Sequence, residues 1–244
     1  MVEIKSNDNQ LIKMFSSLTK KKYRDEYKLF IIDDLDLIKI ADQKNLLEYY
    51  LFDDKLVQLE NCKNNIKTTS NILSKLSSLD NIPNGIGICK MVDNNKLSDF
   101  IIALDSIQDP GNGGTILRSA LAFNFNTMLI SENSFDKYNE KFIRASKGSF
   151  FDESVIRCNL LDKLKDLKAE GYQIITADLD KNAINVNEFK FDKKTVLVVG
   201  NEGNGISKEI DTIKDKCIYI PINNIESLNV GVAASIIMSK NVVK

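Results

Sequence analysis

The chain has 244 residues, no histidine and no tryptophan, and its 33 lysines and arginines nearly balance its 34 aspartates and glutamates. This length suits one large or two small domains of a soluble globular protein, and no apolar run approaches the ~18 residues of a membrane-spanning helix. Without histidine there can be no Ser-His-Asp or Cys-His site, no H-E-x-x-H zinc site and no imidazole general base.

The four cysteines are scattered through the chain and show no metal-binding spacing. The first ten residues are polar and mixed in charge, so they do not predict a signal peptide. We therefore expect a cytoplasmic protein with reduced cysteines and no metal ion.

The first part of the chain predicts short strands and helices in alternation. Polar residues 6–8 precede the first apolar positions with helical spacing and are a plausible capping segment. The expected elements are a helix over 11–18, a strand over 29–32, a helix over 35–40, a strand over 46–52, a helix over 72–76 and a strand over 86–91. This pattern predicts a small α/β/α domain over residues 1–95.

A basic segment lies within this part of the chain. Residues 11–28 hold six cations against two anions, which is a local charge of 6 − 2 = +4. One interpretation is the solvated end of a helix, and the other is a patch that contacts phosphates. The candidate nucleic-acid contacts are Lys20, Lys21, Lys22, Arg24 and Lys28.

The polar segment 93–99 predicts a linker, and the domain after it, residues 96–244, alternates more regularly. Strands are expected over 100–104, 127–130, 154–156, 173–177, 195–199 and 217–220, and helices over 114–123, 139–146, 160–170, 207–214 and 228–240. Several strands are continuously apolar, which is typical of parallel strands buried on both faces. The pattern predicts a doubly wound parallel sheet, whose ligands bind beyond the carboxyl ends of its strands.

Three loops after predicted strands hold the residues most able to do chemistry. In the first, three glycines precede a helix, Asn112 fits an N-cap position or just precedes it, and Arg118 follows within the helix. This loop lacks the G-K-[ST] ending of a phosphate-binding P-loop. Taken alone, it is also compatible with an ordinary glycine-rich connection and a surface arginine.

The second loop, 198–207, places Glu202 among Gly200, Gly203 and Gly205. The glycine order is G-x-x-G-x-G, not the G-x-G-x-x-G of dinucleotide-binding folds, so it disfavours a Rossmann-type oxidoreductase. In the third loop, Ser227 is a natural N-cap for the last helix. The apolar stripe and small residues of that helix suit core packing or a subunit interface.

Together these motifs resemble the SpoU/TrmH family of RNA ribose 2′-O-methyltransferases, in the SPOUT superfamily. The resemblance covers residues ~99–242 through DPGNGGTILRSA, VVGNEGNGIS and IPINNIESLNVGVAASI, and RASKGS at 144–149 resembles a fourth family segment. A weaker similarity over 21–30 suggests the RNA-binding domain of members that act on ribosomal RNA. The resemblance implies an α/β SPOUT domain with a trefoil knot, after a small N-terminal α/β/α RNA-binding domain.

The resemblance further implies transfer of a methyl group from S-adenosylmethionine to a ribose 2′-hydroxyl, with 23S rRNA as the expected substrate. It places the cofactor at Thr176, Ala177, Gly200, Gly203, Ile220 and Leu228, and the catalytic site at Asn112, Arg118, Glu202, Ser227 and Asn229. Family members dimerise through this domain, so a homodimer is expected. Gly113 departs from the pattern, because an apolar residue is usual there.

Two alternatives stay open within this resemblance. One is a tRNA 2′-O-methyltransferase, which the N-terminal domain of about 95 residues disfavours. The other is a catalytically silent RNA-binding or ribosome-assembly factor with the same fold. The presence of Arg118 and Asn229 favours an active enzyme.

Overall fold

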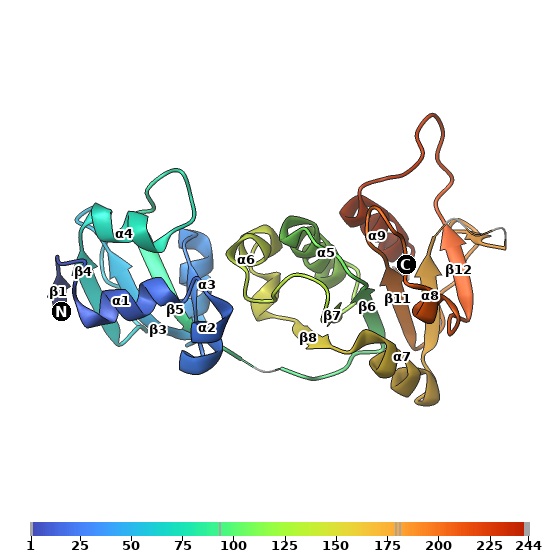
Figure 1. The fold of residues 1–244 in the computed structure, drawn as a ribbon, viewed down its shortest axis with the longest axis horizontal. Helices are drawn as coiled ribbons and strands as arrows, with labels where there is room; N and C mark the ends of the chain where they lie inside the picture. Colours follow the sequence, from blue (N-terminus) through green and yellow to red (C-terminus); the bar gives the residue numbers. More distant parts are fainter. Residues whose placement is uncertain (1, 93, 179, 181, 242–244) are drawn as a thin grey trace. The chain divides into compact units, whose positions relative to one another are not determined.

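The computed structural model describes residues 2–92, 94–178, 180 and 182–241. Some predicted boundaries lie outside these ranges. They are the outer ends of the two predicted domains, at residues 1 and 244, Asp93 of the predicted linker, and the end of the resemblance at residue 242. The chain divides into two compact units, Met1–Asp93 and Asn94–Lys244 (Figure 1). None of the helices in the described ranges is both long and apolar enough to cross a bilayer.

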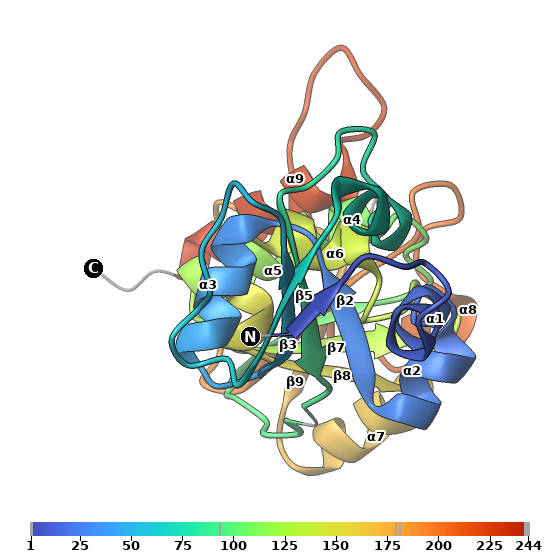
Figure 2. The ribbon, with the colours of Figure 1, turned by 90° about the vertical axis from the view of Figure 1, so that its left-hand side faces the viewer.

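The first unit is a five-stranded sheet with helices on both faces. Its strands, in the spatial order β1-β4-β3-β5-β2, are β1 (Val2–Ile4), β4 (Asn64–Thr68), β3 (Leu47–Phe52), β5 (Gly85–Lys90) and β2 (Leu29–Ile32). The helices are α1 (Gln10–Ser17), α2 (Lys21–Tyr27), α3 (Leu35–Gln43) and α4 (Ser70–Leu76). Figure 2 shows α3 on one side of the strands and α1 and α4 on the other.

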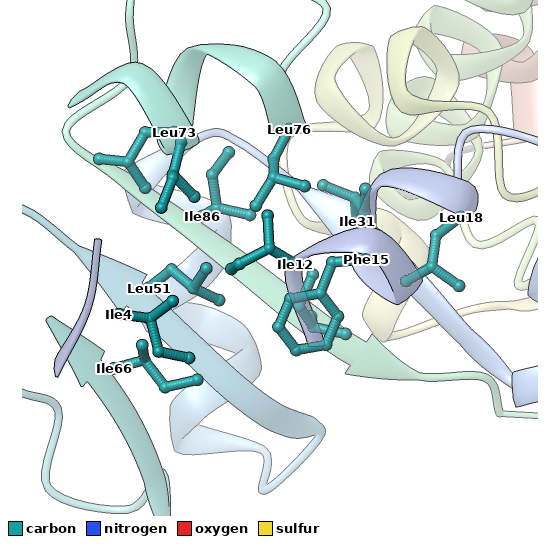
Figure 3. Close-up of a cluster of buried hydrophobic side chains, with 12 residues drawn as sticks. Ile4, Ile12, Phe15, Leu18, Ile31, Leu51, Ile66, Leu73, Leu76 and Ile86 are labelled. Carbon is teal, nitrogen blue, oxygen red and sulfur yellow. The ribbon is translucent and has the colours of Figure 1, made fainter. Parts of the chain in front are cut away.

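Alternation along the strands explains the two faces of this sheet. Ile86 and Ile88 of β5 belong to the cluster formed with α1 and α4. Figure 3 shows Ile86 in this cluster with Ile12, Phe15 and Leu73. Gly85 and Gly87 face the other way, and a Cβ at Gly85 would lie 3.2 Å from the Leu35 side chain of α3. The core therefore depends on apolar residues at the spacing that the sequence shows.

Three elements of this unit escape the sequence pattern. Strand β4 reads Asn-Asn-Ile-Lys-Thr, and β1 has only three residues, so neither carries an apolar run. Helix α2 is too polar to show helical periodicity. The capping residue of α1 is Asn9, whose side chain accepts the Leu11 N–H at 2.9 Å, not the predicted segment 6–8.

Arg24 is a correction to the predicted RNA-binding set. It is only 8% exposed, and its Nη1 donates to the carbonyl oxygens of Leu18 and Thr19, both at 2.9 Å. These bonds tie α2 to the end of α1, so this guanidinium has a structural role. Lys20, Lys21, Lys22 and Lys28 are exposed, with Lys21 paired to Asp25 at 2.5 Å.

The second unit is a seven-stranded sheet in which every described strand pair is parallel. The order is β10 (Ile184–Asn185), β12 (Lys216–Tyr219), β9 (Gln173–Ala177), β11 (Thr195–Val199), β6 (Phe100–Leu104), β7 (Thr127–Ser131) and β8 (Ser154–Cys158). Only the two-residue β10 escaped the sequence pattern. The predicted parallel α/β sheet is confirmed.

Helices cover both faces of this second sheet (Figure 1). One face packs on α7 (Leu160–Ala169) and α8 (Lys208–Asp211), whose Leu164, Leu167 and Ile210 join the buried cluster. Helix α5 (Pro110–Ala122) packs against both α6 (Glu140–Ser146) and α9 (Val230–Met238). Two short 3₁₀ turns, Ser149–Phe151 and Ser239–Asn241, complete the unit.

The strand order brings distant loops together. Because β6 and β11 are parallel neighbours, the loops that follow them leave the same edge of the sheet. The chain then runs from β12, on the far side of β9, to α9, which packs on α5. All three predicted functional loops therefore meet at the carboxyl edge.

Candidate functional site

Hydrogen bonds join the loops after β6 and β11. The Asp105 N–H donates to the Val199 carbonyl at 2.9 Å, and the Ser207 N–H donates to Asp105 Oδ2 at 2.8 Å. From the second loop, Asn201 Nδ2 donates to the Ser106 carbonyl at 2.9 Å. These bonds fix the position of the glycine-rich turn at residues 200–205.

The glycine-rich turn is itself tightly closed. Asn201 and Gly205 exchange two backbone hydrogen bonds of 2.9 Å, and Asn201 Oδ1 accepts the N–H groups of Gly203 and Asn204 at 2.9 and 3.1 Å. Gly205 has a φ of +67°, in the left-handed region that favours glycine. A Cβ on Gly200 would lie 2.3 Å from the Gly205 carbonyl oxygen.

We expect Gly200→Ala to destabilise the second unit by about 2–3 kcal/mol, because the added methyl meets rigid backbone with nowhere to move. Gly203→Ala is the matched control, since a Cβ there would find its nearest atom at 3.4 Å. Urea unfolding followed by circular dichroism measures both changes. Equal stability of the two variants would contradict the packing explanation.

A cavity of about 490 Å³ opens beside this turn. Its wall includes four of the six predicted cofactor contacts, which are Ala177, Gly200, Ile220 and Leu228. Ser227 also lines it, and so do residues that sequence reasoning missed, namely Asp178, Tyr219, Ile222, Glu226, Val230, Ala233 and Ile237. Asp178 could have been found, because it directly follows the carboxyl end of β9.

The other two predicted cofactor contacts, Thr176 and Gly203, are not among the described lining residues of the cavity. Thr176 is fully buried within β9, paired with Val198 and Cys217 of the neighbouring strands. The wall begins one residue later, at Ala177. Gly203 is exposed within the turn.

The wall of the cavity is mostly apolar, and its charged side chains are acidic. Asp178, Glu202 and Glu226 line it, and its described lining residues include no lysine or arginine. The remaining surface is largely backbone and aliphatic side chains from β12, the loop after it and α9. Such a cavity favours a ligand that is partly apolar and carries positive charge.

A chain of hydrogen bonds links one polar residue from each loop. Asn112 Nδ2 donates to Glu202 Oε1 at 2.6 Å, and Asn229 Nδ2 donates to Asn112 Oδ1 at 3.0 Å. Asn112 therefore bridges two residues that line the cavity. Three of the five predicted catalytic residues come together here, from sequence positions up to 117 apart.

Both expected helix caps are wrong. Helix α5 starts earlier than expected, with Asp109 as N-cap and Pro110 at its first position. The Gly111 N–H, at 2.8 Å, and the Lys141 ammonium, at 2.7 Å, both donate to Asp109 Oδ1. These contacts, that of Lys141 above all, hold the pKa of Asp109 below its ordinary value.

Asn229, not Ser227, caps α9. Its Oδ1 accepts the N–H groups of Gly231 and Val232 at 2.9 and 3.3 Å. One side chain thus holds the helix end with its oxygen and Asn112 with its nitrogen. Ser227 is left exposed at the cavity wall.

The structure does not bring Arg118 into this network. Its side chain is exposed on α5, and it is not a described lining residue of the cavity. Within the described ranges, no hydrogen bond or ion pair holds its guanidinium. Leu121, one turn further along α5, and Val232 of α9 are also exposed, at 39% and 47%.

The unusual Gly113 has a packing explanation. A Cβ there would lie 2.1 Å from Cζ of Phe135, whose ring is buried against α5. Phe135 thus occupies the space that an apolar side chain at position 113 would need. Its ring also packs on Phe142 of α6, with centroids 4.9 Å apart.

We expect Gly113→Val to destabilise the second unit by roughly 3 kcal/mol, because the Phe135 ring cannot stay in place. The double variant Gly113→Val with Phe135→Ala should recover much of that loss, since the new side chain fills the vacated space. A double-mutant cycle in urea tests this coupling. Additive losses in the two single variants would refute it.

Comparisons with known proteins identify the family of this chain. A family model described as the SpoU rRNA Methylase family matches residues 99–239. The chain is 29% identical to the 23S rRNA (guanosine(2553)-2'-O)-methyltransferase RlmP of Bacillus subtilis, covering 98% of each chain. It is 37% identical to the tRNA (guanosine(18)-2'-O)-methyltransferase of Aquifex aeolicus, over 57% of this chain and 67% of the relative. A crystal structure of an AdoMet-bound rRNA methyltransferase from Sinorhizobium meliloti shares the fold, with a TM-score of 0.86, 24% identity, and coverage of 98% of this chain and 96% of that chain.

Proposed function

The chain belongs to the SpoU rRNA methylase family, and on that premise we propose that it transfers a methyl group from S-adenosylmethionine to a ribose 2′-hydroxyl of ribosomal RNA, with 23S rRNA as the substrate. The observation that carries the proposal is the hydrogen-bonded chain Glu202–Asn112–Asn229 at the wall of a cavity. It joins the polar residues of all three family motifs at one place. The proposed substrate places the activity in the cytoplasm.

The residues at the cavity fit this cofactor. Much of its wall is aliphatic side chain and backbone, which suits an adenosine, and its three carboxylates suit a ligand with one net positive charge. When bound, S-adenosylmethionine supplies an electrophilic methyl group on a sulfonium ion, so the proposed reaction uses no metal ion. We assign cofactor contacts to Ala177, Gly200, Ile220 and Leu228.

The protein's own task is to place the ribose and to stabilise charge on its 2′-oxygen. We assign the orientation of the nucleotide to Asn112 and Asn229, which already hold one another, and the support of Asn112 to Glu202. Ser227, exposed at the cavity wall, is assigned a substrate contact. Arg118 is assigned the positioning of the ribose and phosphate and the stabilisation of developing alkoxide charge.

A homodimer through the second unit accounts for the position of Arg118. Its side chain lies outside the network of its own subunit, on the same side of α5 as the exposed Leu121. Val232 on α9, the helix that packs on α5, is also exposed, so the surface assigned to the interface takes in both helices. A partner covering this surface would place Arg118 at the seam. The trefoil knot of the family also belongs to this proposal, formed where the chain passes from β12 to α9.

The first unit is proposed to bind RNA through Lys20, Lys21, Lys22 and Lys28, which are exposed. These cations attract phosphates without reading sequence. The ribosomal substrate is favoured over tRNA because the match to the B. subtilis rRNA enzyme covers 98% of this chain, both units included. The match to the A. aeolicus tRNA enzyme covers only 57% of it.

The proposal is tested with labelled S-adenosylmethionine and total RNA from cells that lack the enzyme. Ribosomal and transfer RNA are separated after the reaction, and the labelled nucleoside is identified. We expect label in 23S rRNA as a 2′-O-methyl nucleoside. Label in tRNA alone would overturn the substrate assignment. No label in any RNA, with no cofactor binding by calorimetry, would favour a silent RNA-binding factor.

A further inference from the structure

A second cavity lies beside the one proposed for the cofactor. It has a volume of about 400 Å³ and shares Asn201 and Gly205 with the first, so the glycine-rich turn contributes to both walls. Its other described lining residues come from the loop after β6, from Asn133 after β7 and from the end of the turn. None of them takes part in the Glu202–Asn112–Asn229 chain.

Hydrogen bonds within the protein engage the only described acidic group in this wall. Asp105 is 4% exposed, and its carboxylate accepts the Ser207 N–H at 2.8 Å and the Ser106 hydroxyl at 3.2 Å. Gln108 Nε2 also donates hydrogen bonds, to the backbone carbonyl oxygens of Ser106 and Asn133 at 3.0 and 2.7 Å. The Asp105 carboxylate and the Gln108 amide nitrogen therefore serve to build the wall.

Two side-chain amides remain for a ligand. Asn133 and Asn204 are exposed, they line the second cavity, and within the described ranges their side chains make no hydrogen bond. Each amide offers a donor and an acceptor without net charge. The described lining residues include no lysine or arginine, so phosphate is a poor match for this cavity.

The chemistry of a nucleobase edge matches these groups, because bases are read by paired donors and acceptors such as those of asparagine. The position of the second cavity, close to the catalytic chain, also suits a nucleobase. Glu202, in the catalytic chain, and Asn204, in the second cavity, are two residues apart on one turn. The catalytic chain and the second cavity therefore share one short turn, as sites for the ribose and the base of one nucleotide must.

We propose that the second cavity receives the base of the methylated nucleotide, and that Asn133 and Asn204 read the edge of that base. This inference rests on the proposed function and makes these two residues specificity determinants. The base must be unstacked to reach the cavity, as is usual for enzymes that act on one nucleotide of a folded RNA.

The test compares two ribosomal RNA transcripts that differ only in the base at the methylated position. We expect the wild-type enzyme to prefer its natural base in kcat/KM. Asn133→Ala and Asn204→Ala should each reduce this preference by roughly tenfold, since one base contact is lost in each. Asn204→Asp keeps the side-chain shape but removes the amide donors, so it should also change the preference.

Asn182→Ala is the matched control, because Asn182 is an exposed asparagine of the same unit that lines neither cavity. The affinity for S-adenosylmethionine should be the same in all these variants, which separates base reading from a damaged fold. Unchanged base preference in both alanine variants would overturn the inference, as would a wild-type enzyme indifferent to the base. Failure of the proposed function would show differently, as no methylation of either transcript by the wild type.

Discussion

Replacement of Arg118 by alanine should lower kcat for methyl transfer by roughly 10²–10³-fold, the usual effect of removing a group that stabilises an oxyanion. Stability should be unchanged, because the Arg118 side chain is exposed and no described group of the subunit holds it. Affinity for S-adenosylmethionine should also be unchanged, since Arg118 does not line the cavity. Single-turnover rates, calorimetry and thermal unfolding measure the three quantities.

Arg157→Ala is the control for this prediction. Arg157 is another exposed arginine of the same unit, and it donates to the Glu132 carbonyl away from the cavity. Its loss should leave the rate unchanged. Arg118→Lys should restore little activity, because an ammonium cannot make the paired contacts of a guanidinium. Full activity in Arg118→Ala would remove Arg118 from the catalytic site.

Mixed dimers would test whether Arg118 acts across a subunit seam. Arg118→Ala and Asn229→Ala are each expected to be inactive alone. If Arg118 serves the partner's cavity, a mixed dimer combines one intact Asn229 with an intact Arg118 from the other subunit, and activity returns to about half. No recovery would place Arg118 and Asn229 in the same subunit's site.

The stability of the second unit should fall as the pH rises from 5 to 8, because of one buried carboxyl group. Glu153 is 5% exposed, and neither of its oxygens has a hydrogen-bond partner among the residues that the structure describes. Burial, and secondarily the charge of Asp152, raise the pKa of Glu153 from 4.5 to about 9. The folded unit therefore holds a proton that the unfolded chain releases above its ordinary pKa.

The sign follows from this difference in bound protons. The contribution of this proton to the free energy of unfolding is fully present below pH 4.5. It is lost as the pH rises towards 9, at about 1.4 kcal/mol for each pH unit. Glu153→Gln carries no titrating proton, so its stability should not show this slope. It should exceed the wild type by about 3 kcal/mol at neutral pH. Urea unfolding at several pH values measures the difference, and parallel pH profiles would show that Glu153 is ionised in the folded unit.

The strands of the second sheet, apart from β10, were predictable because their signal is local. A continuous run such as Thr195–Val199 is buried on both faces, and its residues alone indicate that. The same holds for α1, α3 and α4 of the first unit, whose apolar spacing follows one face. Strand β4 and helix α2 could not be predicted, because their stability comes from neighbours in the sheet and from Arg24, not from their own apolar residues.

The candidate site, too, was predictable from the sequence only in part. The three motif loops, their order and the residue types able to orient a nucleotide were all visible in the sequence, as were seven of the residues that line the first cavity. The helix caps were misassigned, because several residues near each helix start could serve and only backbone geometry selects Asp109 and Asn229. Thr176 lies within its strand, because the edge of the sheet comes one residue later than the sequence suggested.

The sequence by itself determined the alternation of strands and helices, the family and the polar residues offered by each loop, because these depend on neighbours along the chain. Only the tertiary structure decided which of those residues meet. Asn112 reaches Glu202 across 90 residues and Asn229 across 117. Phe135 takes the space left by Gly113, and Arg24 is buried at the junction of two helices. Such contacts depend on the order of strands in the sheet and on side-chain packing, which no local pattern encodes.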